Sequence, residues 1–143
     1  MDENQGMNPH PADRIQAARD DIAAQIQNYR DLVGAASKAS GMSLTRIDAA
    51  LAAFEPAFFN NLLIALDARF ARRPLRGAAS VELSVLAASL LHHGGVLTPG
   101  ADLPYDADAA LLRIDRGERV ALNADDFESL CAAFLRELQG DAA

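Results

Sequence analysis

Hydrophobic residues recur every three or four positions along most of the chain, which is the spacing of a helix with one apolar face. The first such pattern begins at Pro11 and ends near Ser40 and Gly41. Its apolar stripe consists of Ile15, Ala18, Ile22, Ile26, Tyr29, Val33 and Ala36. So narrow a stripe suits an antiparallel partner helix within a bundle, or a second copy of the protein. Residues 1–10 lack this pattern, and we interpret them as a flexible tail.

The next apolar stretch predicts two consecutive helices. Ser43 can cap the first of them. Its predicted buried face consists of Leu44, Ile47, Leu51 and Phe54. Pro56 then predicts a boundary, because the residue before a proline is pushed out of the helical region and proline itself tolerates a first helical position. The helix that begins there is apolar on several sides, which indicates a central core element. Its apolar residues are Phe58, Phe59, Leu62, Leu63, Ile64, Leu66 and Phe70.

The C-terminal half predicts two more helices with a small β-element between them. Ser80 can cap a helix that ends at His92, where the following Gly94 and Gly95 allow a left-handed conformation. Two short apolar runs around a turn at residues 115–118 then predict a β-hairpin over residues 111–122. Asn123 caps the last helix, which has Phe127, Leu130, Cys131, Phe134, Leu135 and Leu138 facing inward. The predicted fold is mainly α, a four- or five-helix bundle with a small hairpin before the last helix, in a single domain over residues 11–143.

Composition excludes several functional classes. Of the 143 residues, 13 are Lys or Arg and 20 are Asp or Glu, which gives a net charge of −7 and a pI near 4.8. Most of the surface therefore repels a polyanion, so we expect no binding of duplex DNA. We find no apolar run of the roughly 20 residues that a membrane span needs, and the acidic, polar start does not resemble a signal peptide. With one cysteine, Cys131, which we interpret as a buried packing residue, these features favour the cytoplasm.

One segment departs from the acidic character of the chain. Arg69, Arg72, Arg73 and Arg76 lie within eight residues, beside a single nearby acid, Asp67. Arginines at the end of a helix complement its dipole and bind its last carbonyls, which is a purely structural interpretation. The alternative interpretation is a docking point for an anionic partner.

Few residues suggest chemistry. His92 and His93 are adjacent, so their side chains diverge by about 100° on a helix and do not form a metal pair. Either of them can act as an acid or base near neutral pH if the fold brings a carboxylate close, and Glu82 and Asp102 are the candidates. A cationic histidine is also favourable at a helix C-terminus without any further role. The sequence gives no reason to expect a cofactor or a metal ion.

The stretch from Val81 to Val96 forms a helix that breaks at His-His-Gly-Gly before a hairpin and a closing helix. It resembles the end of small bacterial HEPN-like helical domains, and also small uncharacterised bacterial proteins with the same layout. In HEPN ribonucleases the resemblance implies an active centre with Arg four to six residues before His, often as Arg-Asn-x-x-x-His and usually completed across a dimer. His92 matches the histidine, whereas Ala87 and Ala88 replace the arginine and asparagine. Alanine can neither hold a phosphate nor stabilise developing negative charge. The resemblance therefore implies an inactive module for partner binding or dimerisation.

Two functional hypotheses follow. The first is a non-catalytic, cytoplasmic interaction module that binds a protein partner or itself, through the first helix or the basic segment. The second is an RNA-cleaving enzyme in which His92 or His93 is the general base and Arg72, Arg73 or Arg76 replaces the missing motif arginine.

Overall fold

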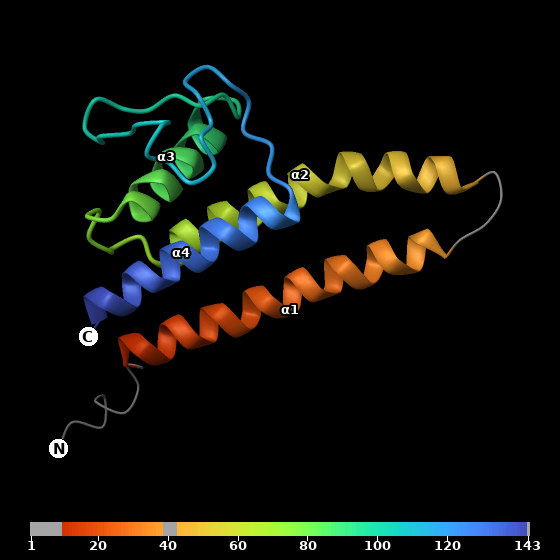
Figure 1. Cartoon of the computed structure of the whole chain (residues 1–143), viewed down its shortest axis with the longest axis horizontal. Helices are drawn as coiled ribbons and strands as arrows, with labels where there is room; N and C mark the ends of the chain where they lie inside the picture. Colours follow the sequence, from red (N-terminus) through yellow and green to blue (C-terminus); the bar gives the residue numbers. More distant parts are fainter. Residues whose placement is uncertain (1–9, 39–42, 143) are drawn as a thin grey trace.

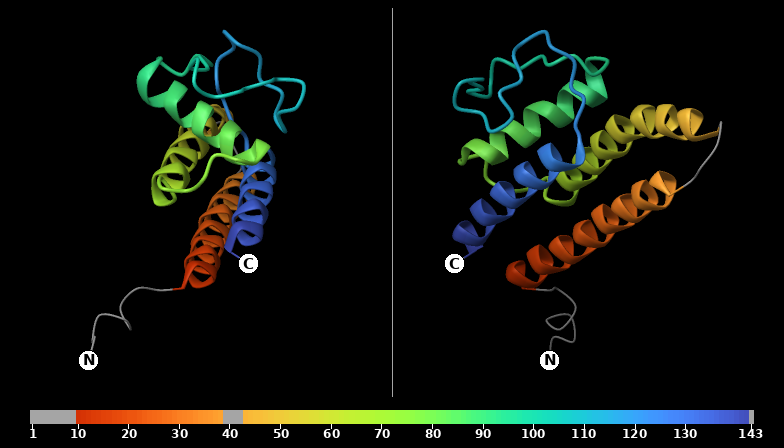
Figure 2. Two further views of the ribbon diagram at one scale, coloured as in Figure 1. Left: turned by 90° about the vertical axis from the view of Figure 1, so that its left-hand side faces the viewer. Right: turned by 45° about the vertical axis from the view of Figure 1, so that its right-hand side comes forward.

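The computed structural model describes residues 10–38 and 43–142, and these contain four helices (Figure 1). The helices are α1 (Pro11–Ser37), α2 (Ser43–Arg69), α3 (Ala78–His92) and α4 (Ala124–Ala142). The pair α2 and α4 forms the middle of the molecule, with α1 packed on one side and α3 on the other (Figure 2). The predicted helical bundle is confirmed. The predicted flexible tail lies outside the described residues except for His10, whose Nδ1 accepts a hydrogen bond from the N–H of Ala12 and caps α1.

Residues Ser43–Arg69 form one helix, so the predicted boundary at Pro56 is wrong. A proline inside a helix removes the hydrogen bond to the carbonyl four residues earlier, here that of Ala52. Ala52 lies on an exposed part of α2, where water can hydrate that carbonyl in place of the missing N–H. The helix therefore continues through Pro56 and changes direction about half-way along its length, as Figure 1 shows.

The unbroken α2 also corrects the expectation that the chain has no apolar run of membrane-spanning length. Within the described residues, Thr45–Arg69 is long and apolar enough to cross a membrane, by length and composition only. A helix boundary at Pro56 would divide this stretch into two pieces, each too short to span a membrane. Asn60, in the second half, donates to the carbonyl of Val120 (3.1 Å) and accepts from the N–H of Leu122 (3.3 Å). The second half of α2 is therefore hydrogen-bonded to the connection before α4.

The most deeply buried element is α3, and not the stretch from Pro56 to Phe70 that the sequence favoured. Nine of the 15 residues of α3 are buried. The second half of α2 buries a single stripe, which consists of Phe59, Leu63 and Leu66 and is continued by Phe70 just after the helix. The difference arises because α3 packs on α2 and α4 with one face, while the connection over residues 93–123 covers other faces of the helix (Figure 1). Leu97, Tyr105, Ala110, Val120 and Leu122 are the buried hydrophobic residues of this connection.

The predicted hairpin over residues 111–122 does not form. A turn exists near Gly117, but the chain after it pairs with residues 95–97 in an isolated antiparallel bridge between Val96 and Arg119. The N–H groups of Leu111 and Leu112, which a hairpin would need, donate instead to the carboxylate of Glu82 at 2.8 and 2.9 Å. Arg113 has a φ of 53°, which takes the chain out of the extended conformation. Hydrogen bonds to a buried carboxylate thus take the place of pairing between residues 111–114 and 119–122.

The ends of α3 and α4 are held by side chains, in one case not the predicted one. Asn123 caps α4 as expected, since its Oδ1 accepts from the N–H of Asp126 at 2.7 Å. Ser80 does not cap α3, because the helix begins two residues earlier. Its first N–H groups, those of Ala79 and Ser80, donate to the carboxylate of Glu137 at 2.8 and 2.9 Å. A carboxylate from α4 therefore satisfies donors that a local serine was expected to satisfy.

Candidate functional site

Of the two carboxylates considered as partners of His92 or His93, Glu82 lies far from both histidines. His92 and His93 are exposed at the end of α3, and the N–H of His93 donates to the carbonyl of Ser89 (3.0 Å). Glu82 lies ten residues before His92 on the same helix, which corresponds to a separation of about 15 Å along its axis. The structure therefore does not bring Glu82 to either histidine. Within residues 10–38 and 43–142, no three His, Cys, Asp or Glu side chains are grouped closely enough to hold a metal ion.

Glu82 holds the long connection onto α3. Its side chain is 2% exposed, and both carboxylate oxygens are occupied by backbone N–H groups. Burial raises the pKa of Glu82, because desolvation disfavours the charged form, while the two hydrogen bonds oppose this shift. Nearby, the hydroxyl of Tyr105 donates to the carbonyl of Ile114, and burial raises the pKa of Tyr105 to about 12. These polar groups have structural partners of their own.

The four arginines of the basic segment have different environments. Arg73 is a structural residue, with a side chain 4% exposed, an ion pair to Asp67 (2.8 Å) and hydrogen bonds to the carbonyls of Phe70 and Ser80. Arg69 pairs with Asp21 of α1 at 2.9 Å. Arg72 and Arg76 are exposed, and the described part of the chain offers neither of them an ion pair or a side-chain hydrogen bond. The structural interpretation therefore holds for Arg73, whereas Arg72 and Arg76 face solvent.

A hollow of about 530 Å³ lies between the start of α1, the end of α2 and α4, and we call it the arginine hollow. Arg69, Arg72 and Arg73 line it, but Arg76 does not. Arg14 of α1 completes the lining, and its Nη2 donates to the carbonyl of Arg69 at 3.2 Å. Sequence reasoning missed Arg14 because 55 positions separate it from Arg69, and no local pattern connects them.

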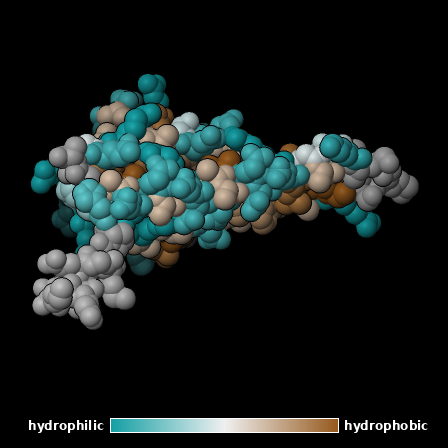
Figure 3. All heavy atoms as spheres, turned by 90° about the horizontal axis from the view of Figure 1, so that it is seen from below, coloured by the Kyte–Doolittle hydropathy of each residue, from teal (hydrophilic) through white to brown (hydrophobic). Residues whose placement is uncertain are grey.

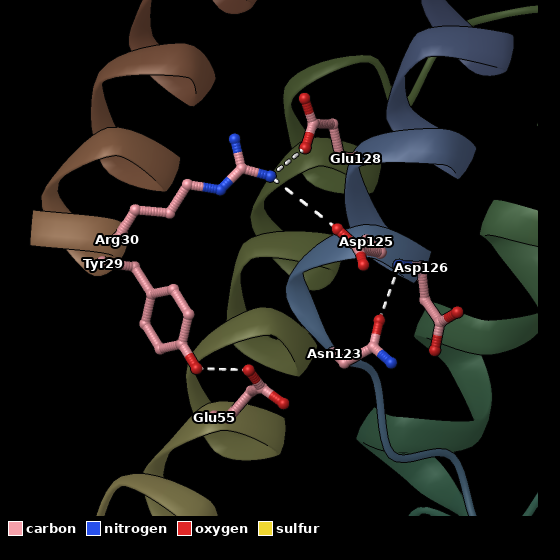
Figure 4. A network of polar contacts seen from close by, with 7 residues as sticks. All are labelled: Tyr29, Arg30, Glu55, Asn123, Asp125, Asp126 and Glu128. Carbon is pink, nitrogen blue, oxygen red and sulfur yellow. Dashed lines mark hydrogen bonds and ion pairs between the residues drawn. The ribbon is translucent and has the colours of Figure 1, made fainter. Parts of the chain in front are cut away.

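A set of polar contacts marks where the core ends along α1 and α2 (Figure 4). The hydroxyl of Tyr29 donates to the carboxylate of Glu55 on α2, and burial and this carboxylate raise the pKa of Tyr29 to about 12. The next residue, Arg30, pairs with Glu128 of α4 at 2.6 Å and lies 3.8 Å from Asp125. These contacts involve the first residues of α4, and on the far side of them only α1 and α2 continue (Figures 1 and 2).

We call this continuation the arm and define it as residues 30–37 of α1 and 45–55 of α2. No side chain in either range is buried, although the arm is largely apolar. The predicted buried face of residues 44–54 is therefore wrong: Phe54 is 43% exposed, Ile47 and Leu51 are half-buried, and the side chain of Leu44 lies outside the described set. Leu32 of α1 is 49% exposed. In Figure 3 hydrophobic residues are visible on the surface of the arm.

Cys131 lines a hollow of about 340 Å³ between α1 and α4. It is buried, as predicted for a packing residue, and burial raises its pKa to about 11. A thiol with a raised pKa is a poor nucleophile near neutral pH, because little of it is ionised.

The chain was compared with protein-family models, with curated proteins and with solved structures, and none of the three comparisons gave a match. A function must therefore be inferred from the geometry of the chain itself.

Proposed function

We propose that this protein is a non-catalytic helical module that forms a dimer, with the arm of each copy as the interface. The observation that carries the proposal is the absence of any buried side chain over residues 30–37 and 45–55, although 11 of these 19 residues are Ala, Val, Leu, Ile or Phe. In an apolar 18-residue window of the Thr45–Arg69 part of α2, only 17% of the residues are buried. Contiguous apolar surface of this kind is typical of interaction sites.

The arm also gains little stability from its own contacts. Isolated helices of fewer than about 12–15 residues are marginal in water, and most helix stability in proteins comes from burial of an apolar face. Phe54 stacks on Phe58 with ring centroids 5.3 Å apart, yet its outer surface faces solvent. A partner that covers Phe54, Leu51 and Ile47 would supply the missing burial.

A second copy suits the arm because the arm carries little net charge. It contains two basic residues, Arg30 and Arg46, and three acidic ones, Asp31, Asp48 and Glu55, which gives a net charge of −1. The whole chain has a net charge of −7, so two copies repel each other least where this weakly charged surface faces its own equivalent. Two helix pairs that face each other about a two-fold axis form a four-helix bundle, a common solution in homodimers.

The composition supports the cytoplasm as the location of this dimer. The single cysteine and the acidic surface suit a soluble protein in a reducing compartment, and in the proposed dimer the apolar surface of α2 is covered by protein and not by lipid.

The proposal is tested by sedimentation equilibrium of the full chain with Phe54→Ser. We expect a dimer for the wild type and a dissociation constant about 30-fold higher for the variant, which corresponds to roughly 2 kcal/mol for a central aromatic contact. Leu91→Ser is the matched control, because Leu91 is more exposed, at 57%, but lies at the end of α3. It should leave the dissociation constant unchanged.

Three results would overturn the proposal. The first is a wild-type protein that stays monomeric at hundreds of micromolar. The second is an equal effect of Phe54→Ser and Leu91→Ser on the dissociation constant. The third is co-flotation of a monomer with phosphatidylcholine vesicles that Phe54→Ser abolishes, which would assign the arm to a membrane surface.

A further inference from the structure

We propose that the arginine hollow binds a small organic anion, one that carries a carboxylate or phosphate group beside an apolar group. This inference does not depend on the dimer, because the arginine hollow and the arm involve different residues. Its volume of about 530 Å³ falls within the range of roughly 300–1,000 Å³ that is typical of small-molecule sites.

The charge of the arginine hollow selects an anion. Four of the chain's 13 basic residues line it, and no Asp or Glu does. Two of these four are neutralised from outside the lining, Arg69 by Asp21 and Arg73 by Asp67. Arg14 and Arg72 have no ion pair among the described residues, so the arginine hollow keeps about two positive charges in a chain that is acidic elsewhere. Guanidinium groups recognise carboxylates and phosphates through paired N–H donors.

An unsatisfied donor is a second and independent observation. The Nε of Arg73 is buried and has no hydrogen-bond partner, although the other two nitrogens of this guanidinium are bonded. Buried polar groups without a partner are rare in folded proteins and point to a missing acceptor. Because Arg73 lines the arginine hollow, an anion oxygen at its base is the acceptor that we assign to this N–H.

The guanidinium groups are already positioned before any ligand binds. Arg14 lies over the ring of Phe70 with its Cζ 5.6 Å from the centroid, and Arg73 lies over Phe134 at 4.9 Å. Cation–π contacts and backbone hydrogen bonds restrict both side chains, which lowers the entropy cost of binding. The rest of the wall includes Ile15, Phe70 and Leu138, which would contact an apolar group next to the anionic head.

The experiment measures binding of four probes to the full-length protein by isothermal titration calorimetry. The probes are benzoate, phenyl phosphate, inorganic phosphate and benzylamine, so that head group and ring are varied separately. We expect benzoate or phenyl phosphate to bind, inorganic phosphate to bind at least tenfold more weakly than phenyl phosphate, and benzylamine not to bind. Which of the two ring anions binds more tightly identifies the head group.

The variants are Arg14→Gln and Arg72→Gln, and Arg76→Gln is the matched control, since Arg76 is exposed in the same segment but lies outside the arginine hollow. Each of the first two should weaken binding of the preferred probe at least tenfold, and Arg76→Gln should leave it unchanged. Thermal unfolding of each variant checks that the fold is retained, and Arg72→Gln is the safer variant because Arg72 bonds to no described residue.

Four calorimetric results would each overturn the inference: no heat with either ring anion at millimolar concentration, equal binding of benzylamine, inorganic phosphate as tight as phenyl phosphate, or an equal loss in Arg76→Gln. Sedimentation of Arg72→Gln keeps this inference separate from the dimer. The variant should form the wild-type dimer, and a loss of dimer would place the arginine in the subunit interface and remove the ligand site.

Discussion

Both halves of α2 are mainly apolar, but they have opposite environments. After Pro56 the helix buries Phe59, Leu63 and Leu66, and Asn60 is bonded to the connection that covers α3. Before Pro56 no described side chain is buried. Hydrophobicity alone therefore does not place a residue in the core of this molecule. The difference is the presence of a neighbouring element, because α4 begins at Ala124 and packs beside only the second half.

The packed part of the molecule also differs from the arm in how many hydrogen bonds its charged side chains make. Glu82 and Glu137 each bind two backbone N–H groups, and Arg73 binds three carbonyls and a carboxylate. Such buried groups contribute only when nearly all their hydrogen bonds are made, and they fix one arrangement of the surrounding chain. The arm has no comparable anchor beyond Tyr29 and Glu55. The comparison suggests a rigid body that carries a helix pair whose partner is another molecule.

The largest expected effect comes from two matched substitutions, five residues apart, that test whether the two halves of α2 contribute differently to stability. Phe59→Ala removes a side chain with no exposed surface, and we expect it to lower the free energy of unfolding by about 3–5 kcal/mol. Phe54→Ala, in protein dilute enough to be monomeric, should lower it by less than about 1 kcal/mol. Urea unfolding followed by circular dichroism measures both. Losses of similar size would mean that the arm has a core of its own.

A smaller effect tests the polar anchors. Glu137→Gln removes one of two acceptors at the start of α3 and places an amide N–H against a backbone N–H, so we expect a loss of about 1–3 kcal/mol. Glu128→Gln, also on α4, breaks only the half-exposed pair with Arg30 and should cost less than about 1 kcal/mol. Thermal and urea unfolding of the two variants should rank them in this order. The reverse order would contradict the anchoring role of Glu137.

The smallest effect is a dependence on pH. The folded-state pKa of Glu82 is raised above its unfolded value of about 4.5, so the contribution of this proton to stability is fully present below that pH and is lost as the pH rises through the folded pKa. The stability of the wild type minus that of Glu82→Gln should therefore fall as the pH is raised from 4 to 8. Urea unfolding of both proteins across this range measures the difference. A difference that rises with pH would show that the two hydrogen bonds outweigh burial.

The sequence predicted the elements whose signals are local. The stripe of α1, the Asn123 cap and the inward face of α4 each depend on spacing within a few residues. The cap and the face of α4 are confirmed, and the stripe of α1 is buried from Ile15 to Tyr29. The hairpin failed for a non-local reason, since Glu82 takes the N–H groups of Leu111 and Leu112 from 29 and 30 positions away. At Pro56 the helix continues although proline usually marks a helix boundary, because the hydrogen bond that Pro56 cannot make would be to the carbonyl of Ala52 on an exposed turn.

The candidate sites also divide into features that a local pattern predicts and features that depend on distant parts of the chain. The arginines of residues 69–76 were visible as a cluster, but Arg14 and the apolar wall came from another part of the chain. The exposure of the arm could not be read from its pattern, since a face that packs within one molecule and a face that packs between two have the same periodicity. One signal was available in hindsight: residues 49–66 contain a single charged residue, Glu55, which is unusually few for a helix with a solvent-facing side.

The chain contains two tyrosines and no tryptophan, and each tyrosine lies in a different region of the molecule. Tyr29 is at the base of the arm, bonded to Glu55, and Tyr105 is in the connection over α3, bonded to Ile114. Emission excited at wavelengths that phenylalanine does not absorb therefore arises from two phenols, one for each region. Tyr29→Phe and Tyr105→Phe each leave a single natural fluorophore. Such a pair of variants can report, without an added dye, whether the base of the arm or the covering connection loosens first during unfolding.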